Sequence, residues 1–591
     1  MFDGRIYRAA FVPLLFVVVV VGFALTGGAT PLRSTLAPDA FDGARAYGEL
    51  RSLVRGFPNR RPGSAGDEAL AAYVARAFGQ STGGAGGGFQ VSTRRFGAET
   101  AEGSRTLTTV TAVRPGSTGM KPIAILAHRD AVSSGSPAEL SGTAALLELA
   151  RVFAESETRR TIVLVSTSGG SEGDAGASDY ARSAGGLDAA IALGDLAGQR
   201  AHKPFVLAFS GGTATAPGAL SGTVEGAISQ EVGAVSGAPG FASQLAHLVF
   251  PLATGEEAAL EDGGTPAVLV QASGERAPSA DEPVSETRLS NFGRAVLSAT
   301  YALDEGPDVP RPPSTRLSLG RKALPVWAIR LLVLALLLPP LLVCVDALAR
   351  LRRRREPIGR WLLLTLGGAL PFLTVALFAV ALGALGIVAA PAAQLPVAAL
   401  SADGSAPAAL VAALLVLALG LLAWPALVRR LGLASRPRTD AAGLAPMLVL
   451  LGVALVVWLF DPFAALLLVP AAHLWLLAAD PRARSLAAAA LAAASIPIAL
   501  LLLAYARELG LGPLALGESV VLSLAGGRVG VPAALLWSLA LGCVPALIAR
   551  ALALAPSDPS RPIDRVEIAT RGPLSYAGPG SLGGTESALR R

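Results

Sequence analysis

The distribution of apolar residues along the chain constrains its fold more than any other feature of the sequence. One apolar stretch runs from about residue 9 to 26, and seven more follow residue 324. Residues 30–320, between them, have the mixed composition of a water-soluble domain. A helix rises 1.5 Å per residue, so it needs about 20 apolar residues to cross the hydrocarbon core of a bilayer. The sequence therefore predicts eight membrane spans, with one soluble domain inserted after the first.

The seven later spans share long apolar runs separated by short polar loops. They are predicted near 325–348, 361–388, 406–428, 442–460, 462–479, 485–505 and 531–554. The expected organisation is an N-terminal anchor at 1–29, a soluble domain at 30–320, a seven-helix region at 321–555 and a disordered cytoplasmic tail at 556–591. A cleaved signal peptide is the alternative for residues 1–29, because Gly27-Gly28-Ala29 resembles a cleavage site.

Arginine placement predicts how these spans are oriented. The loops after the second, fourth and sixth spans carry arginines, among them 352–355, 429–430 and 482, whereas the loops on the other side carry only Arg507 and Arg528. Positive charge collects in cytoplasmic loops. We therefore expect a multi-pass plasma-membrane protein with both termini in the cytoplasm and residues 30–320 outside. The net charge of +6 is explained by the same clusters, so the lipid bilayer is the expected partner and nucleic acid is not.

Short apolar runs alternate with amphipathic segments in the soluble domain. Helices are predicted near 42–55, 66–79, 141–156 and 287–303, and strands near 121–127, 160–167, 189–194, 204–209 and 266–271. Continuous apolar strands separated by helices predict a sheet covered on both faces, an α/β fold. Both cysteines, Cys344 and Cys543, lie in apolar segments, which excludes a disulfide framework or a cysteine zinc site in this domain.

Polar groups follow several of the predicted strands, at the sheet edge where α/β proteins bind ligands. The first strand is followed by His128-Arg129-Asp130 and later by Ser141-Gly142-Thr143-Ala144-Ala145-Leu146-Leu147-Glu148-Leu149-Ala150-Arg151. The next strands are followed by Ser168-Gly169-Gly170-Ser171-Glu172-Gly173 and by Gly194-Asp195-Leu196-Ala197-Gly198. Gly255-Glu256-Glu257 lies ahead of the last strand.

In order and spacing, these groups resemble the framework of peptidase family M28, the di-zinc aminopeptidases. That framework contains H-x-D, then G-A-D-D-N-A-S-G-x-A-A-L-L-E-L-A-R, then E-E-x-G-x-x-G-S-x-x-Y-A and N-L-D-M-x-G. Upstream, Arg61-Pro62-Gly63-Ser64-Ala65-Gly66 is similar to the family's entry motif. The resemblance covers residues 40–305 and implies a zinc-exopeptidase-like mixed sheet flanked by helices. The predicted fold class is therefore α/β plus a helical region of eight spans.

The resemblance also implies which catalytic groups are kept and which are replaced. His128 and Asp195 align with ligands of one zinc ion, and Asp130 aligns with the aspartate that orients the histidine. The other positions carry different residues: Ala138 at the bridging aspartate, Gly170 at the general base, Ser171 at the adjacent ligand and Glu257 at the last histidine. The mechanism that the resemblance implies needs a bridged metal pair and a proton acceptor for water, so that mechanism is not expected here.

We therefore expect a pseudopeptidase that has no resident cofactor and that binds an extracytoplasmic peptide, glycan or protein partner or serves as a scaffold beside the helical region. One alternative is an active, diverged zinc metallopeptidase. It would hold a single zinc ion on His128, Asp195 and Glu257, and Glu139 or Glu172 would shift in register to replace a lost acidic group. If the enzyme is inactive, Glu139 and Glu172 are expected to be solvated loop charges. The other alternative is a transporter or assembly factor with an accessory domain, in which His473 is the ionisable candidate within a span.

Overall fold

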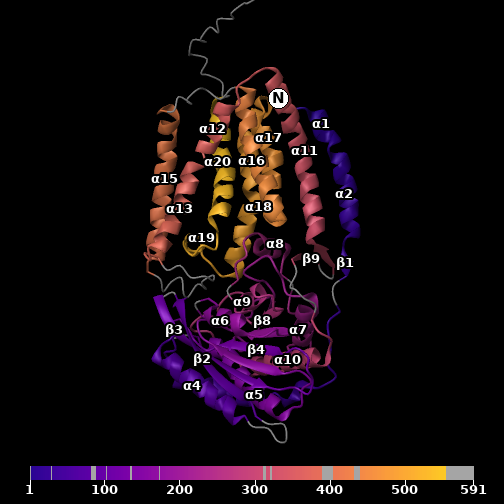
Figure 1. The fold of residues 1–591 in the computed structure, drawn as a ribbon, viewed down its shortest axis with the longest axis vertical. Coiled ribbons are helices and arrows are strands. Elements are labelled where there is room, and N and C mark those ends of the chain that lie inside the picture. Colours follow the sequence, from indigo (N-terminus) through magenta and orange to yellow (C-terminus); the bar gives the residue numbers. More distant parts are fainter. Residues whose placement is uncertain are drawn as a thin grey trace, which may run out of the picture.

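The computed structural model describes residues 2–27, 30–81, 88–100, 103–132, 136–171, 173–237, 239–253, 255–309, 315–319, 322–388, 404–430 and 439–553. These residues form a helix bundle and, at one end of it, an α/β domain (Figure 1). The predicted tail at 556–591 and Glu172 lie outside the described residues.

The helix bundle confirms the prediction of eight helices long and apolar enough to cross a membrane. They are α1–α2 (Gly4–Ala9 and Phe11–Phe23), α11 (Val326–Arg353), α12–α13 (Gly359–Gly367 and Leu370–Ala384), α15 (Ala406–Arg430), α16 (Asp440–Phe460), α17 (Pro462–Ala479), α18 (Ala487–Glu508) and α20 (Val531–Ala553). A shorter apolar helix that the sequence analysis did not predict, α19 (Pro513–Ala525), lies between α18 and α20 in the sequence.

Close helix crossings and satisfied polar groups hold the bundle together. Gly542 of α20 lies so near the turn between α12 and α13 that an added Cβ would be 2.5 Å from the Ala369 nitrogen, the close approach that small residues permit between apolar helices. The ring of His473 is bonded on both sides, with Nδ1 2.6 Å from the Tyr7 hydroxyl and Nε2 2.8 Å from the Leu336 carbonyl. His473 thus links α17 to α1 and α11.

A mixed seven-stranded sheet forms the centre of the α/β domain. Its order is β2 (Gln90–Thr100), β3 (Gly103–Arg114), β5 (Ile162–Thr167), β4 (Ile123–His128), β6 (Ala189–Leu193), β8 (Ala267–Val270) and β7 (Val206–Leu207). β5, β4, β6 and β8 are parallel, whereas β2, β3 and β7 pair antiparallel. All five predicted strands are present. The β2–β3 hairpin was not predicted, because polar residues such as Arg94 and Arg95 leave it without a continuous apolar run.

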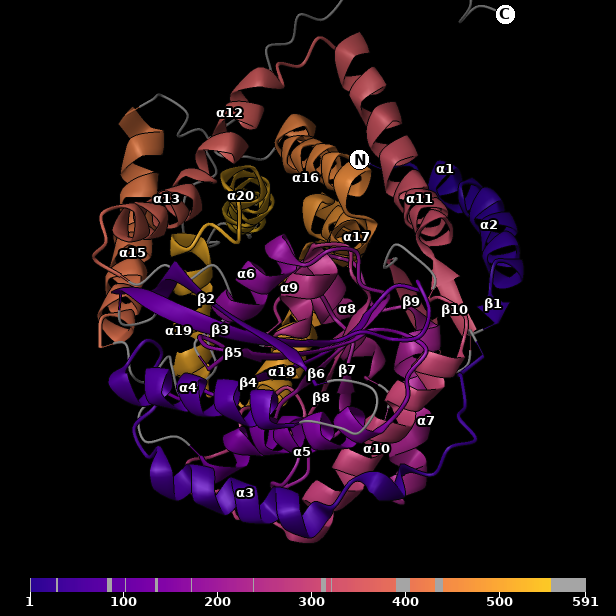
Figure 2. The same cartoon turned by 60° about the horizontal axis from the view of Figure 1, so that its bottom comes forward.

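Helices cover both faces of this sheet, as predicted (Figure 2). On one face, Ile123, Ile125 and Ala127 of β4 belong to the core formed with α3 (Gly43–Gly56), α4 (Ala65–Gln80), α5 (Ser141–Glu155), α7 (Gly218–Glu231) and α10 (Glu286–Glu305). On the other face, Ala124 and Leu126 pack with α6 (Ala175–Ser183) and α9 (Glu257–Asp262). This division follows from the two-residue period of a strand.

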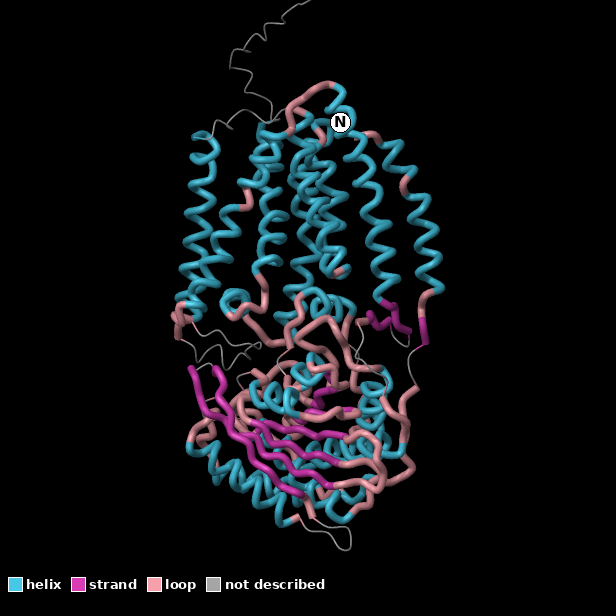
Figure 3. Tube along the Cα trace, in the orientation of Figure 1, coloured by secondary structure: helices cyan, strands magenta, loops and turns pink. Residues whose placement is uncertain are grey.

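Two further contacts join the α/β domain to the helix bundle. A three-stranded antiparallel sheet pairs β1 (Thr26–Gly27), which follows α2, with β10 (Lys322–Pro325), which precedes α11; β9 (Arg316–Leu319) completes it (Figure 3). In addition, Leu245 and Leu248 of α8 (Phe241–Val249) share one apolar core with Leu501 and Leu509 at α18. The domain is therefore packed on the bundle as well as tethered to it.

Candidate functional site

The predicted site residues lie where the parallel strands end. His128 is the last residue of β4 and pairs with Thr167, the last residue of β5. Asp195 follows the end of β6 by two residues. Three parallel strands thus deliver side chains to one edge of the sheet, as the sequence analysis expected.

His128 lies beside a glutamate at the start of α9. Its Nδ1 atom is 4.0 Å from Oε2 of Glu256, and its side chain is 17% exposed. The other carboxylate oxygen of Glu256 accepts a hydrogen bond from the Thr167 hydroxyl. Burial raises the pKa of Glu256, and the nearby His128 partly offsets the rise. The sequence pattern indicated the next residue, Glu257, as the substitute ligand, so Glu256 is a site residue that the pattern did not predict.

Gly170, the position of the general base in the resemblance, is packed against His128. An added Cβ at Gly170 would lie 2.5 Å from Cβ of His128 and 2.7 Å from its Cγ. Atoms of this kind do not approach so closely, so a side chain here would displace the imidazole or the loop. The space that a glutamate would occupy is filled by the histidine itself.

Asp130 is fully buried and bonds the same loop. One carboxylate oxygen accepts from the Gly170 nitrogen at 3.2 Å, and the other accepts from the nitrogen and the hydroxyl of Ser171. The resemblance implies that Asp130 orients the ring of His128. In the structure, its hydrogen bonds hold residues 170 and 171 instead. Asp130 thereby holds Gly170 in place against His128.

Asp195 caps the turn that follows it. Its Oδ1 atom accepts from the nitrogens of Ala197 at 2.9 Å and Gly198 at 2.6 Å, and its side chain is buried. Gly198 is needed here, because an added Cβ would lie 2.3 Å from Oδ2 of Asp195. Burial raises the pKa of Asp195 to about 6, while the two backbone donors act in the opposite direction.

Glu139 and Glu257, two acids that the sequence offers as substitute groups, have little exposure to solvent. Glu139 follows Ala138 in a short helix, Pro137–Leu140, where it forms a capping box with Ser136 and lies 3.5 Å from the Arg60 guanidinium. Burial raises the pKa of Glu139 to about 7 against the influence of Arg60. Glu257 is buried at the start of α9, and burial raises its pKa well above the usual value. Glu139 thus caps its own short helix and pairs with Arg60, and His128 is close enough to lower its pKa as well.

His128, Asp195 and Glu257 do not gather into a metal-binding group. Among the described residues, His247, Glu275 and Glu508 are the set of three His, Cys, Asp or Glu side chains whose ligand atoms lie within 4.8 Å of one another. At the sheet edge, both carboxylate oxygens of Asp130 accept from backbone nitrogens, whereas backbone nitrogens occupy only Oδ1 of Asp195. His128 and Glu256 are the two potential ligands that face each other.

Arg129, the middle residue of the His-Arg-Asp motif, braces this edge. Its fully buried guanidinium is 2.8 Å from Oδ1 of Asp67 in α4 and donates to the carbonyls of Thr108, Ser166 and Thr167. Asp67 in turn accepts from the Gly63 nitrogen and the Ser168 hydroxyl. One buried ion pair therefore ties together α4 and the strands β3, β4 and β5.

The side of the sheet that carries α6 and α9 faces the helix bundle (Figure 1). Arg528, in the loop between α19 and α20, donates to the Pro251 carbonyl at 3.2 Å. Burial raises the pKa of Asp174 and Asp262, which flank α6 and α9, and the Arg528 guanidinium partly offsets both shifts. The bundle thus reaches the rim of the candidate site.

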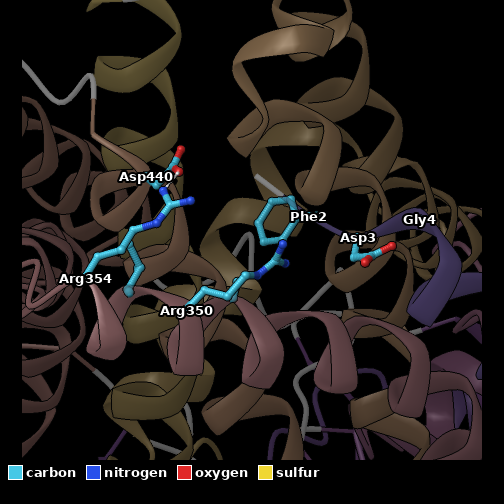
Figure 4. A pocket seen from close by; sticks show the side chains of 8 residues that line it. Phe2, Asp3, Gly4, Arg350, Arg354 and Asp440 are labelled. Atoms are coloured by element: carbon cyan, nitrogen blue, oxygen red, sulfur yellow. Dashed lines mark ion pairs between the residues drawn. The ribbon is translucent and has the colours of Figure 1, made fainter. Parts of the chain in front are cut away.

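Cavities lined by described residues also lie away from the sheet edge. One, of about 270 Å³, lies between α3, α4 and α5. Another, of about 570 Å³, lies at the end of the bundle remote from the α/β domain, between the start of the chain and α11 (Figure 4). It is lined by Phe2, Asp3, Gly4, Ala347, Arg350, Leu351, Arg354 and Asp440.

Comparisons with known proteins agree with the sequence resemblance. Residues 109–232 match the model of peptidase family M28. Similar solved structures include a glutaminyl cyclase from Porphyromonas gingivalis (15% identity, 44% of this chain and 98% of that chain, TM-score 0.34). They also include the zinc aminopeptidase BSAP from Bacillus subtilis (12%, 46% and 99%, TM-score 0.35) and the LapA aminopeptidase from Legionella pneumophila (15%, 46% and 73%, TM-score 0.36).

A search of curated proteins by sequence gave no match. The family match covers β4, β5, β6 and the loops that carry His128, Gly170 and Asp195. The chain thus carries a peptidase family M28-like domain, joined to eight helices that are long and apolar enough to span a membrane.

Proposed function

We propose that this chain is a membrane-anchored pseudopeptidase whose M28-like domain binds a peptide or protein partner without hydrolysing it. The contact between Gly170 and His128 carries this proposal. A general base must lie within hydrogen-bond reach of the water that it deprotonates. The base position of the family has no side chain here, and the imidazole occupies the space beside it.

The state of the carboxylates supports the same conclusion. A pair of zinc ions needs a bridging carboxylate and about three protein ligands for each ion. Ala138 stands at the bridge, Asp130 binds residues 170 and 171, and Asp195 binds the turn at 197–198. The donor set does not fit the family's metal pair. We therefore derive no hydrolytic step for this domain.

The proposed location is the plasma membrane, with the M28-like domain outside the cell and both termini in the cytoplasm. Arg350 and Arg354 line the cavity at the end of the bundle remote from the domain (Figure 4). Positive charge marks the cytoplasmic ends of spans. At the opposite end of the bundle, next to the candidate site, Arg528 donates to the Pro251 carbonyl, and the loops there were predicted to carry few arginines.

The test uses the full chain purified in lipid nanodiscs. Hydrolysis of aminoacyl anilides is compared between the wild-type protein and the His128→Ala variant, and peptide binding is followed by hydrogen exchange in segments 128–132 and 167–171. We expect no turnover above the variant and slower exchange with peptide. Turnover that His128→Ala abolishes would refute the proposal.

A diverged hydrolase is the second candidate, and the His128–Glu256 contact favours it. A glutamate beside the reacting groups can act as a proton acceptor, and Glu256, whose pKa is raised by burial, lies 4.0 Å from the histidine. The same anilide assay separates the two candidates, because only the hydrolase loses turnover in a Glu256→Gln variant.

A further inference from the structure

His247, Glu275 and Glu508 meet where the M28-like domain contacts the helix bundle. His247 belongs to α8, Glu275 follows β8, and Glu508 is the last residue of α18. Nε2 of His247 is 2.8 Å from Oε1 of Glu275 and 3.8 Å from Oε2 of Glu508. The His247 and Glu275 side chains are 2% and 8% exposed, and that of Glu508 is 21% exposed.

The contacts of the imidazole determine which nitrogen carries hydrogen. Nδ1 of His247 is 2.9 Å from the Leu252 carbonyl oxygen. A carbonyl only accepts, so Nδ1 carries the hydrogen, and in the neutral ring Nε2 presents a lone pair. That lone pair points at two carboxylates, so a cation must lie between the groups, either a proton on Nε2 or a metal ion; burial lowers the pKa of His247, but the two carboxylates raise it by more. Metal-binding histidines share this arrangement, in which the second nitrogen donates to a carbonyl and fixes the tautomer.

The surroundings hold the three groups in position. The Phe209 ring stacks on the imidazole at 4.1 Å between ring centres, and Tyr505 of α18 meets its edge at 5.1 Å. The Tyr505 hydroxyl donates to the Phe250 carbonyl, and Arg276 donates to the Arg507 carbonyl at 2.6 Å. Domain and bundle are thus bonded on both sides of the cluster, so its members are fixed relative to one another.

Charge and distance both match a divalent cation. A protonated imidazole with two carboxylates has a net charge of −1, whereas a neutral imidazole with two carboxylates and a divalent ion has none. Glu508 also stands at the C-terminus of α18, where the helix dipole disfavours an anion. Ligands bound tetrahedrally to zinc lie about 3.3 Å apart, and the separations of 2.8 and 3.8 Å bracket this value.

We propose that His247, Glu275 and Glu508 form a structural binding site for a divalent transition metal, with zinc the best fit, that joins the M28-like domain to the helix bundle. Two ligands come from the domain and one from α18, so the bound ion fixes how the two parts sit. The site is separate from the sheet edge that carries His128, and it does not depend on whether that edge is catalytic.

The test measures metal on the full chain in nanodiscs, after chelation and reloading with zinc or cobalt. Bound zinc is counted by mass spectrometry, and the visible absorption of cobalt reports the number of ligands. The His247→Ala and Glu508→Gln variants test the site, and Glu508→Gln preserves the fold if the histidine variant does not. His202→Ala is the matched control, because His202 is an exposed histidine 3.3 Å from Arg276 at the same junction. His128→Ala controls for the sheet edge.

We expect one equivalent of zinc in the wild-type, His202→Ala and His128→Ala proteins, and at least a tenfold lower content in the two site variants. Cobalt should give a four-coordinate spectrum that Glu508→Gln removes. Two results would overturn the inference: a folded wild-type chain that takes up no metal, which leaves a protonated ion triad, or metal that is lost with His128→Ala and kept in His247→Ala. Only the second result would also count against the proposed function.

Discussion

The buried ion pair between Arg129 and Asp67 gives the sharpest stability prediction. In an Asp67→Asn variant the guanidinium stays fully buried and loses its counter-charge. Removing one partner of a buried pair costs about 3–5 kcal/mol, because the remaining charge is left uncompensated. Folded domains have total stabilities of about 5–15 kcal/mol. The variant should therefore lose a large part of the stability of the M28-like domain.

The neighbouring residue of α4 supplies a matched control. Glu68 pairs with Arg95 at 3.4 Å, and the Arg95 side chain is 75% exposed. Exposed pairs contribute about 0–1 kcal/mol. Arg95→Met should thus change stability by less than about 1 kcal/mol, whereas Arg129→Met should be several times more destabilising.

The assay must report on the M28-like domain alone. All six tryptophans, at positions 327, 361, 424, 458, 475 and 537, lie in the helix bundle, so their fluorescence follows the bundle. Pulse proteolysis in urea, scored on fragments from residues 30–309, follows the domain, and the midpoint shift multiplied by the m-value gives the change in free energy.

A double-mutant cycle completes the test. The Asp67→Asn/Arg129→Met protein should be more stable than the sum of the two single changes predicts, because neither charge is left alone. Additive effects, or an Asp67→Asn loss below about 1 kcal/mol, would refute the assignment of this pair as the brace of the sheet edge.

Three further predictions follow from the packing and the charges. Gly170→Ala should destabilise the M28-like domain by about 1–3 kcal/mol through its clash with His128, and Gly170→Glu should restore no anilide hydrolysis; Gly185→Ala is the control by pulse proteolysis, since a Cβ there meets nothing within 4 Å. Burial raises the pKa of Glu225 from 4.5 to about 7, so the folded domain binds this proton more tightly and loses stability as pH rises from about 4.5 to about 7. Glu225→Gln should match the wild-type urea midpoint near pH 4 and exceed it at pH 8, by up to about 3 kcal/mol, and equal midpoints at pH 8 would contradict this. Gly542→Ala should lower the melting temperature of the helix bundle, followed by tryptophan fluorescence, because its Cβ would lie 2.5 Å from the Ala369 nitrogen, whereas Gly452→Ala, with open space around it, should not.

The sequence predicted the frame of the molecule because apolar periodicity is a local signal. The eight apolar helices, the strands β4 to β8 and the helices α3, α4, α5 and α10 all follow from it. The β2–β3 hairpin escaped prediction because its exposed arginines interrupt the apolar pattern, as edge strands often require. The helix α8 was not predicted either. Its apolar face packs against α18, a helix far away in the sequence, so no local pattern indicates why that face is apolar.

At the candidate site, side-chain direction was harder to predict than position. His128, Asp130, Gly170 and Asp195 all lie at the expected edge, because strand ends fix the backbone. A gap-free alignment selected Glu257, yet the turn into α9 brings Glu256 to the histidine. The Ser136-to-Glu139 spacing is a capping box that the sequence itself displays, and it would have identified the partner of Glu139. Nothing local marks His247 and Glu508, since only tertiary folding brings them together.

The pairing of β1 with β10 has a consequence for how the chain is assembled. Thr26 lies opposite Ala323, and Gly27 opposite Lys322, so the polypeptide leaves the first span and returns to the second at nearly the same point. Closely spaced ends are what allow one domain to be inserted within another. The M28-like domain is thus an insertion between the two helices, α2 and α11, of a helical hairpin. Replacing residues 28–321 with a two-residue turn should leave that hairpin intact, and the helix bundle is expected to fold as a unit in its own right.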